Sequence, residues 1–364
     1  MSSLEETLSE YDYDFQPEMI AMEPAEPRDS AKLLVYRPHS AKGSAGQASF
    51  DTFANIGEYL PANAVLVLND TKVFPARLHC TKKTGGQVEV FYLGLDERTP
   101  PQSSPLKREG GTIRALTNHF LEVGERVFLT PEIYFECLGK EDKIYTLRPS
   151  FPISDVQKIF SQYGETPIPP YIKNSKLSEA ELREKYQTVF AKNTGSVAAP
   201  TASLHFTAEL LEKLKRQGIQ IEFVTLHVNL GTFAPLTEDA LLIGKLHKEW
   251  YEVSEKTATA LVKAKQDGRP IIAVGTTAVR TLEEWASEFP RSDLGKIGET
   301  RLFIRPGYEF KFVDGMITNF HVPKSSLLML VAAFVGREKL FELYGEAMKN
   351  DFRFFSFGDG MLLY

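Results

Sequence analysis

The chain changes character near residue 150, and that change limits the folds that it can adopt. Between residues 61 and 150 the sequence consists of short β-branched segments, among them 64–68, 87–93 and 133–138, separated by glycine-containing turns. Short strands at this spacing, with no helical periodicity between them, are typical of small antiparallel barrels and sandwiches. We therefore predict a small antiparallel β-barrel domain over residues 61–150.

The rest of the chain follows a different pattern. Apolar segments alternate with polar loops and amphipathic helices, and such helices are predicted over 207–217, after Gly275-Thr-Thr277 as far as Trp285, and over 325–335. This alternation is typical of an α/β domain. A chain of 364 residues exceeds the usual size of a single core. We therefore predict a larger mixed α/β, barrel-like domain over residues 1–60 and 151–364, into which the small β-barrel is inserted.

The excess of acidic side chains is confined to the N-terminal region. The chain has 48 acidic and 42 basic residues, a net charge of −6, and residues 1–60 alone carry a net charge of −7. Residues 61–150 have a net charge of +1, and the remainder is neutral. A protein that coats nucleic acid non-specifically needs a dominant basic surface. That class is excluded, whereas specific binding through a local patch stays open.

One local patch is basic. Lys72, Arg77, Lys82 and Lys83 lie in a segment, 71–88, that contains no acidic residue. A strand edge protected by lysines and a contact with nucleic-acid phosphates would both explain such a segment. The residues alone do not decide between the two.

The cysteines, the N-terminus and the apolar runs indicate whether the protein is disulfide-bonded, metal-binding, secreted or membrane-bound. Cys80 and Cys137 do not make a disulfide framework, and neither has the spacing of a zinc site, so no metal is expected. The N-terminus lacks the apolar stretch of a signal peptide. The longest apolar run, 327–335, is far shorter than the roughly 20 residues that span a bilayer. We expect a soluble, cytoplasmic protein with no membrane partner.

Four polar loops occupy the place where α/β proteins bind ligands, between a strand and the helix that follows it. They are 197–207, 225–233, 274–277 and 318–325. Three of the seven histidines, His205, His227 and His321, fall in these loops. A single histidine in a loop usually has a structural role. Three histidines on matching loops give a structural role and a chemical role about equal weight.

Three further segments have a structural interpretation of their own. Gly275-Thr-Thr277 resembles an anion cradle but also fits a simple helix cap, and it matches neither a P-loop nor a dinucleotide-binding glycine motif. Asn69-Asp-Thr71 fits an Asx turn as well as a site. The segment 354–359 is predicted to be a buried strand and turn.

At these same residues the sequence resembles a known family. Over nearly its whole length the chain is similar to the S-adenosylmethionine:tRNA ribosyltransferase-isomerases of queuosine biosynthesis. The matching segments are Tyr11-Asp-Tyr-Asp14, 25–30, Leu66-Val-Leu-Asn-Asp-Thr71 with 75–77, Pro169-Pro-Tyr-Ile172, 186–189, 198–201 with 204–207, 225–228 with 231–233, 273–277 with 279–283, Ile317-Thr-Asn-Phe-His321, and Arg353-Phe-Phe-Ser356 with 358–359. So many long matches in one order are far more specific than any single motif.

A few positions depart from the family pattern. Asn229-Leu230 stands where a Gly-Ala pair is usual, and Ser203 replaces a glycine. Leu246 stands where methionine is common, Lys324-Ser-Ser326 replaces Arg-Ser-Thr, and Gly360 replaces an alanine. Only Asn229-Leu230 changes the chemistry, because it puts side chains where a ligand would otherwise approach the backbone.

The resemblance implies a reaction and its partners. The enzyme would transfer the ribosyl group of S-adenosylmethionine to 7-aminomethyl-7-deazaguanine at the wobble position of a tRNA with a GUN-type anticodon. The products would be epoxyqueuosine in tRNA, adenine and methionine. The sulfonium acidifies the C5′ protons, so a base near pH 7 would form an ylide. Ring opening then expels adenine, the tRNA amine attacks, and epoxide closure displaces methionine. S-adenosylmethionine is thus a substrate, no metal is implied, and a monomer is expected.

The matched motifs supply candidates for the roles that this chemistry needs. The ordinary pKa of histidine suits the base, and we rank His321 before His227 and His205. Asp70 is a candidate for positioning or deprotonating the tRNA amine. The other candidates are Gly275, Thr276, Thr277, Arg280 and Asn319 for S-adenosylmethionine, and Arg28, Asp29, Asn69, Thr71, Lys72 and Arg77 for the tRNA substrate.

Two other functions are compatible with the residues alone. An α/β enzyme that acts on a free nucleoside or sugar would release adenine from S-adenosylmethionine without tRNA. A non-catalytic RNA-binding protein that uses the β-barrel would bind tRNA without turning over S-adenosylmethionine. The second alternative leaves the polar loops 197–207, 225–233 and 318–325 without a purpose.

Overall fold

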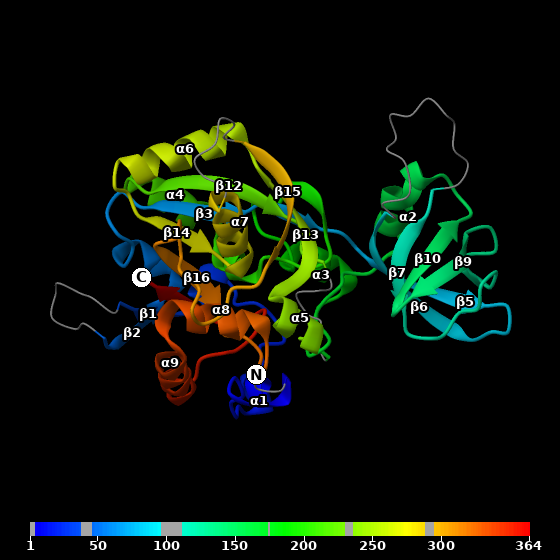
Figure 1. Cartoon of the computed structure of the whole chain (residues 1–364), viewed down its shortest axis with the longest axis horizontal. Coiled ribbons are helices and arrows are strands. Elements are labelled where there is room, and N and C mark those ends of the chain that lie inside the picture. The colour runs from blue at the N-terminus through cyan, green and yellow to red at the C-terminus, as the bar shows by residue number, and fades with distance from the viewer. Residues whose placement is uncertain (1–3, 38–45, 96–110, 174, 230–235, 288–294) are drawn as a thin grey trace. The chain divides into compact units, whose positions relative to one another are not determined.

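The computed structural model describes residues 4–37, 46–95, 111–173, 175–229, 236–287 and 295–364. They form two compact units (Figure 1). The larger unit comprises residues 1–72, 169–178 and 184–364, and the smaller unit comprises residues 73–168 and 179–183. Each unit has its own sheet, and the expected combination of a mixed α/β domain with a small antiparallel barrel is confirmed.

A nine-stranded sheet is the framework of the larger unit. Its order is β15-β13-β12-β3-β14-β16-β17-β1-β2. The strands are β1 (Lys32–Tyr36), β2 (Ala48–Thr52), β3 (Val65–Asn69), β12 (Gln220–Leu226), β13 (Lys245–Val253), β14 (Ile271–Val274), β15 (Lys296–Leu302), β16 (Gly315–Asn319) and β17 (Gly360–Leu363). A separate pair joins β4 (Thr71–Val73) to β11 (Asn193–Ser196). The strands β12, β3, β14 and β16 are parallel neighbours, so their carboxyl ends share one edge of the sheet.

Both faces are buried at the centre of this sheet. In β3, Val65 and Val67 belong to the core on one face, while Leu66 and Leu68 belong to the core on the other. Successive side chains of a strand point to opposite faces. A strand that is covered on both faces must therefore be apolar at every position, which explains the unbroken apolar run in this part of the sequence.

Helices cover the two faces of the larger sheet (Figure 1). Those of the larger unit are α1 (Leu4–Ser9), α4 (Ala208–Arg216), α5 (Glu238–Ile243), α6 (Glu255–Gln266), α7 (Thr276–Ala286), α8 (Ser326–Val335) and α9 (Arg337–Lys349), with short 3-10 helices at Pro17–Met19, Arg28–Ser30, Phe53–Glu58 and Thr201–His205. Side chains of α6, α7, α8 and α9 share a core with Val65, whereas α4 and the 3-10 helix at Phe53–Glu58 pack on the other face. The helices predicted after Thr207, Gly275 and Ser325 are confirmed as α4, α7 and α8.

The smaller unit is built on a closed antiparallel barrel. Its strands are β5 (Arg77–Lys82), β6 (Gln87–Leu95), β7 (Ile113–Thr117), β8 (Arg126–Phe128), β9 (Tyr134–Glu141) and β10 (Ile144–Pro149), in the order β10-β7-β6-β5-β8-β9. The 3-10 helix Ile153–Asp155 and α2 (Val156–Tyr163) follow the barrel in the chain, and α3 (Glu179–Lys185) begins in this unit. Cys80 and Cys137 are buried thiols of this unit.

The boundaries of the units differ from the predicted ones at 61 and 150. The strand expected at 64–68 is β3, which lies between β12 and β14 in the larger sheet. Residues 151–168 belong with the barrel, because the buried ring of Phe160 packs against Phe74, Tyr92 and Phe135. The smaller unit therefore comprises residues 73–168 together with residues 179–183.

The larger unit also differs from a barrel. Among the described residues, its strand order runs from β15 at one end to β2 at the other without closing. The described strands of the larger unit therefore form an open sheet, and those of the smaller unit form a closed barrel. None of the helices in the described part of the chain is long and apolar enough to cross a membrane.

Candidate active site

A cavity of about 430 Å³ lies at the carboxyl ends of the parallel strands of the larger unit. Ligand sites of open α/β sheets lie outside the carboxyl ends of the strands, so this is the place where the fold predicts one. The lining comes from Leu8, Pro170, Tyr171, 198–202, Val228, Leu236, Gly275, Thr276, Thr277, 318–327, Phe355 and Ser356. Three of the four loops predicted from the sequence supply most of these residues.

The first turn of α7 forms one part of the lining. Gly275 precedes the helix with φ +85°, a conformation that favours glycine, and its N–H donates to the carbonyl of Ile317 at 2.7 Å. Thr276 and Thr277 then begin the helix beside the cavity. The first N–H groups of a helix have no partner within it, and the helix dipole makes this end attractive to anions. The interpretation of this segment as a helix cap and its interpretation as an anion cradle are therefore compatible.

A second helix, α8, begins at the same cavity. Ser325, Ser326 and Leu327 contribute to the lining, and the Ser325 hydroxyl accepts a hydrogen bond of 3.2 Å from the N–H of Leu328. Because two helix N-termini adjoin one cavity, their dipoles add to a positive potential there. A carboxylate is the kind of group that such a potential stabilises.

The acidic N-terminal segment holds the loop that leads into α8. The Tyr13 hydroxyl donates to the carbonyl of His321 at 2.6 Å, and the N–H of Lys324 donates to the carbonyl of Tyr11 at 2.9 Å. The Lys324 ammonium pairs with the Asp12 carboxylate at 2.7 Å. The motif Tyr11-Asp-Tyr-Asp14 thus positions one wall of the cavity, and part of the acidity of residues 1–60 serves this purpose.

Among the described residues, His321 is the histidine that lines the main cavity. Its Nε2 shares a hydrogen bond of 2.8 Å with the Thr318 hydroxyl, and its backbone N–H donates to the Tyr344 hydroxyl at 2.8 Å. Burial lowers the pKa of His321 to about 4. The imidazole is therefore neutral at pH 7 and able to accept a proton from a ligand in the cavity.

His205 lies behind the lining and supports Asn319. Its ring is buried and packs on Phe53 with the centroids 4.7 Å apart. The Asn319 amide nitrogen lies 3.3 Å from His205 Nε2 and 3.2 Å from the carbonyl of Phe355, while its oxygen accepts a hydrogen bond from the Thr201 hydroxyl. Burial lowers the pKa of His205 to about 3, so the neutral ring accepts from Asn319 and fixes the orientation of that amide.

His227 is also absent from the described lining. Its ring stacks on Trp250, with the centroids 4.8 Å apart and the planes at 18°, and its Nδ1 lies 2.8 Å from the Thr71 hydroxyl. Burial lowers the pKa of His227 to about 4. The contacts around this ring, including the close approach of Gly195, give it a well-defined orientation.

A side chain at position 195 is expected to disrupt this arrangement. A Cβ atom on Gly195 would lie 2.6 Å from His227 Nε2, so Gly195→Ala should displace the ring and lower the free energy of unfolding by about 1–3 kcal/mol. Chemical denaturation measures the change. Gly345→Ala, where the added Cβ meets nothing within 4 Å, is the control. The effect should shrink in a His227→Ala background, and an equal loss there would contradict the assignment.

Asn69 and Asp70 organise the ends of β3 and β12. The Asn69 side chain is buried, accepts from the N–H groups of Thr71 and Leu226, and donates to the Thr277 hydroxyl at 3.2 Å. The Asp70 carboxylate accepts from the Thr225 hydroxyl at 2.6 Å and from the Asn193 amide at 3.1 Å. Asn69-Asp-Thr71 therefore forms the Asx-type turn considered above, and Asn69 also fixes a hydroxyl of the cavity lining.

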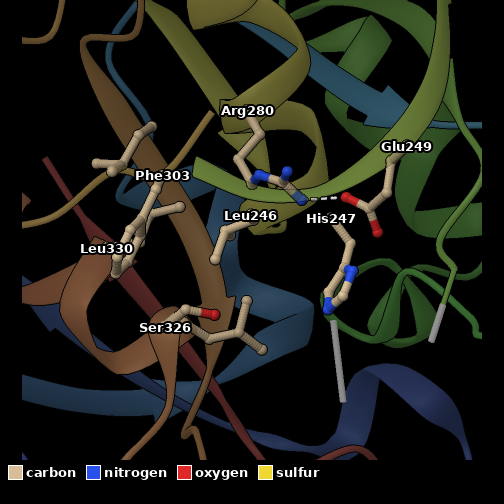
Figure 2. A pocket seen from close by; sticks show the side chains of 9 residues that line it. Leu246, His247, Glu249, Arg280, Phe303, Ser326 and Leu330 are labelled. Carbon is tan, nitrogen blue, oxygen red and sulfur yellow. Dashed lines mark hydrogen bonds and ion pairs between the residues drawn. The ribbon is translucent and has the colours of Figure 1, made fainter. Parts of the chain in front are cut away.

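Arg280 is not among the described lining residues of the main cavity. It pairs with Glu249 of β13 (Figure 2). Both side chains are almost completely buried, and Arg280 Nε also donates to the carbonyl of Leu302 at 3.0 Å. The adjoining space, lined by these two residues with His247 and Ser326 among others, has a volume of only about 10 Å³. It is too small for a substrate carboxylate, so the predicted contact between Arg280 and S-adenosylmethionine does not fit this geometry.

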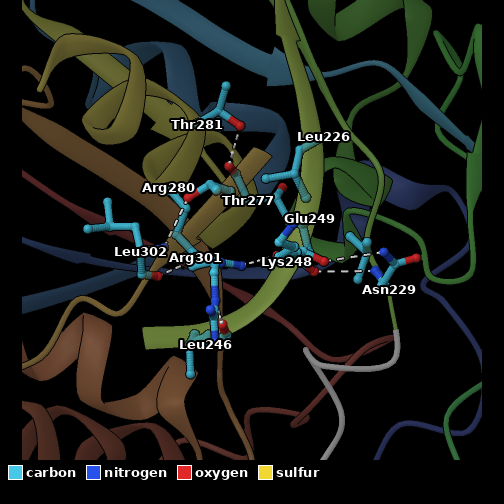
Figure 3. Close-up of polar contacts among 12 residues, drawn as sticks. Leu226, Asn229, Leu246, Lys248, Glu249, Thr277, Arg280, Thr281, Arg301 and Leu302 are labelled. Atoms are coloured by element: carbon cyan, nitrogen blue, oxygen red, sulfur yellow. Dashed lines mark hydrogen bonds and ion pairs between the residues drawn. The ribbon is translucent and has the colours of Figure 1, made fainter. Parts of the chain in front are cut away.

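Glu249 also holds the backbone at Asn229, the first of the two positions that depart from the family pattern. One of its oxygens accepts a hydrogen bond of 3.3 Å from the backbone N–H of Asn229, and the other faces Arg280 (Figure 3). The Asn229 side chain turns to the carbonyl of Lys248 at 3.4 Å. Because Glu249 binds the backbone, the contact does not depend on the residue type at 229. Leu230 lies outside the described residues.

The remaining tRNA candidates do not line this cavity within the described residues. The Arg28 guanidinium donates to the carbonyls of Gln187 at 2.5 Å and Glu184 at 3.1 Å, and Asp29 accepts from the Thr207 hydroxyl. Two more candidates follow β3 in the chain. Lys72 is exposed, and Arg77 belongs to the smaller unit, where it pairs with Glu89 at 3.4 Å.

The three neutral histidines predict an acid-sensitive fold. Their pKa values are lowered to about 4, 4 and 3 in His321, His227 and His205, against about 6.5 in an unfolded chain. Between these values the unfolded state binds more protons than the folded state. The free energy of unfolding should therefore fall as the pH drops from about 6.5 to 4, by up to roughly 1.4 kcal/mol per pH unit for each histidine. Denaturation curves across this range test it, and a His227→Gln variant with an unchanged slope would contradict the assignment.

Sequence reasoning missed several residues of this region. Thr318, Tyr171 and Phe355 line the cavity, and Glu249 supports it from β13. Tyr171 and Phe355 lie in matched segments, so the resemblance contained the signal. Glu249 lies in a strand of mixed polar and apolar residues, and nothing in its local sequence distinguishes it from an exposed glutamate.

An open α/β sheet with a cavity at the carboxyl ends of its parallel strands, and a neutral histidine within that cavity, is the arrangement found in many enzymes that bind small molecules. A sequence profile described as Queuosine biosynthesis protein matches residues 8–363. The chain therefore belongs to the queuosine biosynthesis protein family.

Its relatives have names that agree with this assignment. The chain is 45% identical to the S-adenosylmethionine:tRNA ribosyltransferase-isomerase of Thermotoga maritima. The match covers 98% of this chain and 99% of that enzyme. The enzyme of the same name from Magnetococcus marinus is 44% identical, over 98% of this chain and 94% of that one. The crystal structure of S-adenosylmethionine tRNA ribosyltransferase from Thermotoga maritima superimposes with a TM-score of 0.54 and 34% identity, covering 98% of this chain and 100% of that chain.

Proposed function

We propose that this chain is a tRNA-modifying enzyme that transfers and isomerises the ribosyl moiety of S-adenosylmethionine. The acceptor is 7-aminomethyl-7-deazaguanine at the wobble position of a tRNA with a GUN-type anticodon, and the products are epoxyqueuosine-tRNA, adenine and methionine. The observation that carries this proposal is the 45% identity to an S-adenosylmethionine:tRNA ribosyltransferase-isomerase over 98% of one chain and 99% of the other. The likeness covers nearly all of both chains, so both units of this chain have counterparts in that enzyme.

The main cavity is the proposed site for S-adenosylmethionine. Its volume of about 430 Å³ falls within the range of small-molecule sites. The methionyl carboxylate would lie against the N-termini of α7 and α8, where Thr276 and Ser326 line the cavity. Thr277 and Asn319, which other side chains hold in place, would bind ribose hydroxyls. Arg280 would support the site indirectly, through its place in α7, and would not contact S-adenosylmethionine.

His321 is the proposed base that removes a C5′ proton. It is the histidine of the described lining, and its lowered pKa keeps it neutral at pH 7. The proton would move from C5′ to an imidazole nitrogen, leaving the carbanion stabilised by the adjacent sulfonium. His205 and His227 would act indirectly, through Asn319 and Thr71. Asp70 stays a candidate for the tRNA amine.

The decisive experiment incubates the purified protein with S-adenosylmethionine and tRNA that carries the aminomethyl-deaza base. Release of adenine and a mass increase of the tRNA by the epoxycyclopentanediol group are expected together. Adenine release that needs no tRNA would favour an enzyme acting on free nucleosides. Binding of the tRNA without turnover would favour a non-catalytic RNA-binding protein. A tRNA with the same body but a different wobble base is the matched control.

The charge distribution predicts a modest dependence of tRNA binding on salt. Only a few local contacts with phosphates are expected from a chain of net charge −6, with Lys72, Arg77, Lys82 and Lys83 as the first candidates. A plot of log K against log salt should have a slope no steeper than about −4. Filter binding over a range of salt concentrations measures it. A much steeper slope would require many phosphate contacts and would contradict this prediction.

We also propose that the enzyme works as a monomer in the cytoplasm. Sedimentation velocity at micromolar concentration tests the oligomeric state. The location is proposed because tRNA modification takes place where tRNA is.

A further inference from the structure

The turn between residues 353 and 359 reaches the main cavity through Phe355 and Ser356. The Asp359 carboxylate closes this turn, because it accepts hydrogen bonds from the backbone N–H groups of Arg353 at 2.7 Å and Lys32 at 3.0 Å. Gly358 packs so closely that a Cβ atom there would lie 2.4 Å from the carbonyl oxygen of Arg353. The turn is therefore fixed by contacts at both of its ends.

Phe355 has an unusual backbone conformation within this turn. Its φ of +69° is rare for a bulky side chain, and such conformations persist only where neighbouring contacts enforce them. Phe354 pairs with the N-terminal segment, since its N–H donates to the carbonyl of Met19 at 2.7 Å. Phe355 pairs with the residue that follows β16, through a 3.1 Å hydrogen bond from its own N–H to the carbonyl of Phe320. The chain changes hydrogen-bonding partner between these two residues, and the left-handed conformation of Phe355 makes the change possible.

The consequence is an aromatic wall in the main cavity. Phe355 lines the cavity together with Tyr171 and Ser356. The rings of Phe355 and Tyr171 have their centroids 5.0 Å apart at an angle of 58°, and the Tyr171 hydroxyl lies 2.6 Å from the Ser356 hydroxyl. Phe15 supports Phe355 from another side with its centroid 5.1 Å away. This wall combines apolar ring surface with a pair of hydroxyls that can donate and accept hydrogen bonds.

We infer that Phe355 and Tyr171 bind the purine ring of S-adenosylmethionine, and that the Tyr171 and Ser356 hydroxyls bind its polar edge. This inference rests on the proposed function. A purine has apolar faces that stack on aromatic rings and a nitrogen-rich edge that needs hydrogen bonds. Because the two protein rings are inclined to each other, one of them would lie against a face of the purine and the other against its rim. Burial raises the pKa of Tyr171, so its hydroxyl stays protonated and able to donate to a ring nitrogen.

The rest of the cavity favours the purine of S-adenosylmethionine over the base of the tRNA. The same lining contains the N-termini of α7 and α8, which suit a carboxylate. S-adenosylmethionine carries a purine and a carboxylate in one molecule, whereas the tRNA base carries no carboxylate. A ligand with both groups uses both parts of the lining.

The test compares ligand binding by Phe355→Leu and Tyr171→Leu with binding by the unchanged protein. Isothermal titration calorimetry gives Kd for S-adenosylmethionine and for 5′-methylthioadenosine, which keeps the purine and lacks the amino-acid part. Each substitution should raise the Kd of both ligands by a similar factor. The expected increase is about 5- to 150-fold, the effect of losing one aromatic contact with a base. Tyr171→Leu keeps the test valid if Phe355→Leu does not fold, because Tyr171 is only half-buried.

A matched control separates ligand contact from packing. Phe357→Leu makes the same change two residues further on, at a buried ring that packs on Tyr186 outside the described lining. It should lower Tm and leave both Kd values unchanged. Unchanged Kd values in Tyr171→Leu would overturn the inference, and so would weaker tRNA binding with normal S-adenosylmethionine binding, which would assign the wall to the tRNA base. If the unchanged protein released no adenine from S-adenosylmethionine in the presence of the aminomethyl-deaza tRNA, the proposed function itself would fail.

Discussion

His321→Ala is expected to lower the rate of adenine release by about 10²- to 10⁴-fold, the usual contribution of a general base. His321 lies in the cavity lining, and its neutral ring is the group there that can take a C5′ proton at pH 7. A quench-flow or steady-state assay of adenine with saturating tRNA measures the effect. The Kd for S-adenosylmethionine should change far less than kcat, because the base acts on the transition state.

The pH dependence provides an independent test of the same residue. The base must be unprotonated, and burial lowers the pKa of His321 to about 4. The acidic limb of the kcat profile should therefore lie near pH 4 to 5, and activity should be flat from pH 6 to 7. A limb near 6.5 would point to a histidine in contact with water. His227→Ala and His205→Ala are the comparison variants, and near wild-type rates for all three histidine variants would exclude a histidine base.

Glu249→Ala is expected to destabilise the larger unit by about 3–5 kcal/mol, because it leaves the buried Arg280 without its partner. Arg280 is 4% exposed and Glu249 is 1% exposed, so water does not take over the lost interaction. The same change removes the acceptor for the N–H of Asn229. Urea denaturation monitored by Trp fluorescence measures the loss in free energy of unfolding.

An exposed ion pair on the neighbouring strand is the control for Glu249. Glu299 of β15 pairs with Lys248 at 2.7 Å, with both side chains about half exposed. Glu299→Ala should cost no more than about 1 kcal/mol. A double variant, Glu249→Leu with Arg280→Met, should recover much of the stability, since it removes both buried charges together. Equal losses in Glu249→Ala and Glu299→Ala would contradict a buried role for this pair.

Local sequence signals predicted the parts of the fold that depend on local chemistry. Thr207 and Ser325 mark the starts of α4 and α8, because their hydroxyls accept from N–H groups in the first turn. The sequence predicted the turn at Gly275 in the same way, from residues close together in the chain. The alternation of apolar segments, polar loops and helices located the loop that carries His321, and the resemblance to a family matched the same residues. These features are set by residues a few positions apart, so the sequence contains all of their partners.

The predicted domain boundary failed for the opposite reason. Residues 64–68 have the composition of any buried strand, and only pairing with β12 and β14 assigns β3 to the larger sheet. In the same way, Phe160 follows the barrel in sequence but packs with Phe135 of β9. Strand pairing and ring packing join residues that are far apart in the chain, and hydrophobic patterning does not specify the partner.

The charge distribution and the histidines show the same division between what the sequence determines and what the tertiary structure decides. The sequence by itself determined that the acidic excess belongs to residues 1–60 and that His205, His227 and His321 occupy three polar loops. Only the tertiary structure decided that His321 lies in the cavity while the other two lie outside its described lining. It also decided that Arg280 pairs with Glu249 and that Phe355 faces the cavity. The direction of a side chain and the pKa of a buried group depend on neighbours brought together by folding, and those neighbours are distant in the sequence.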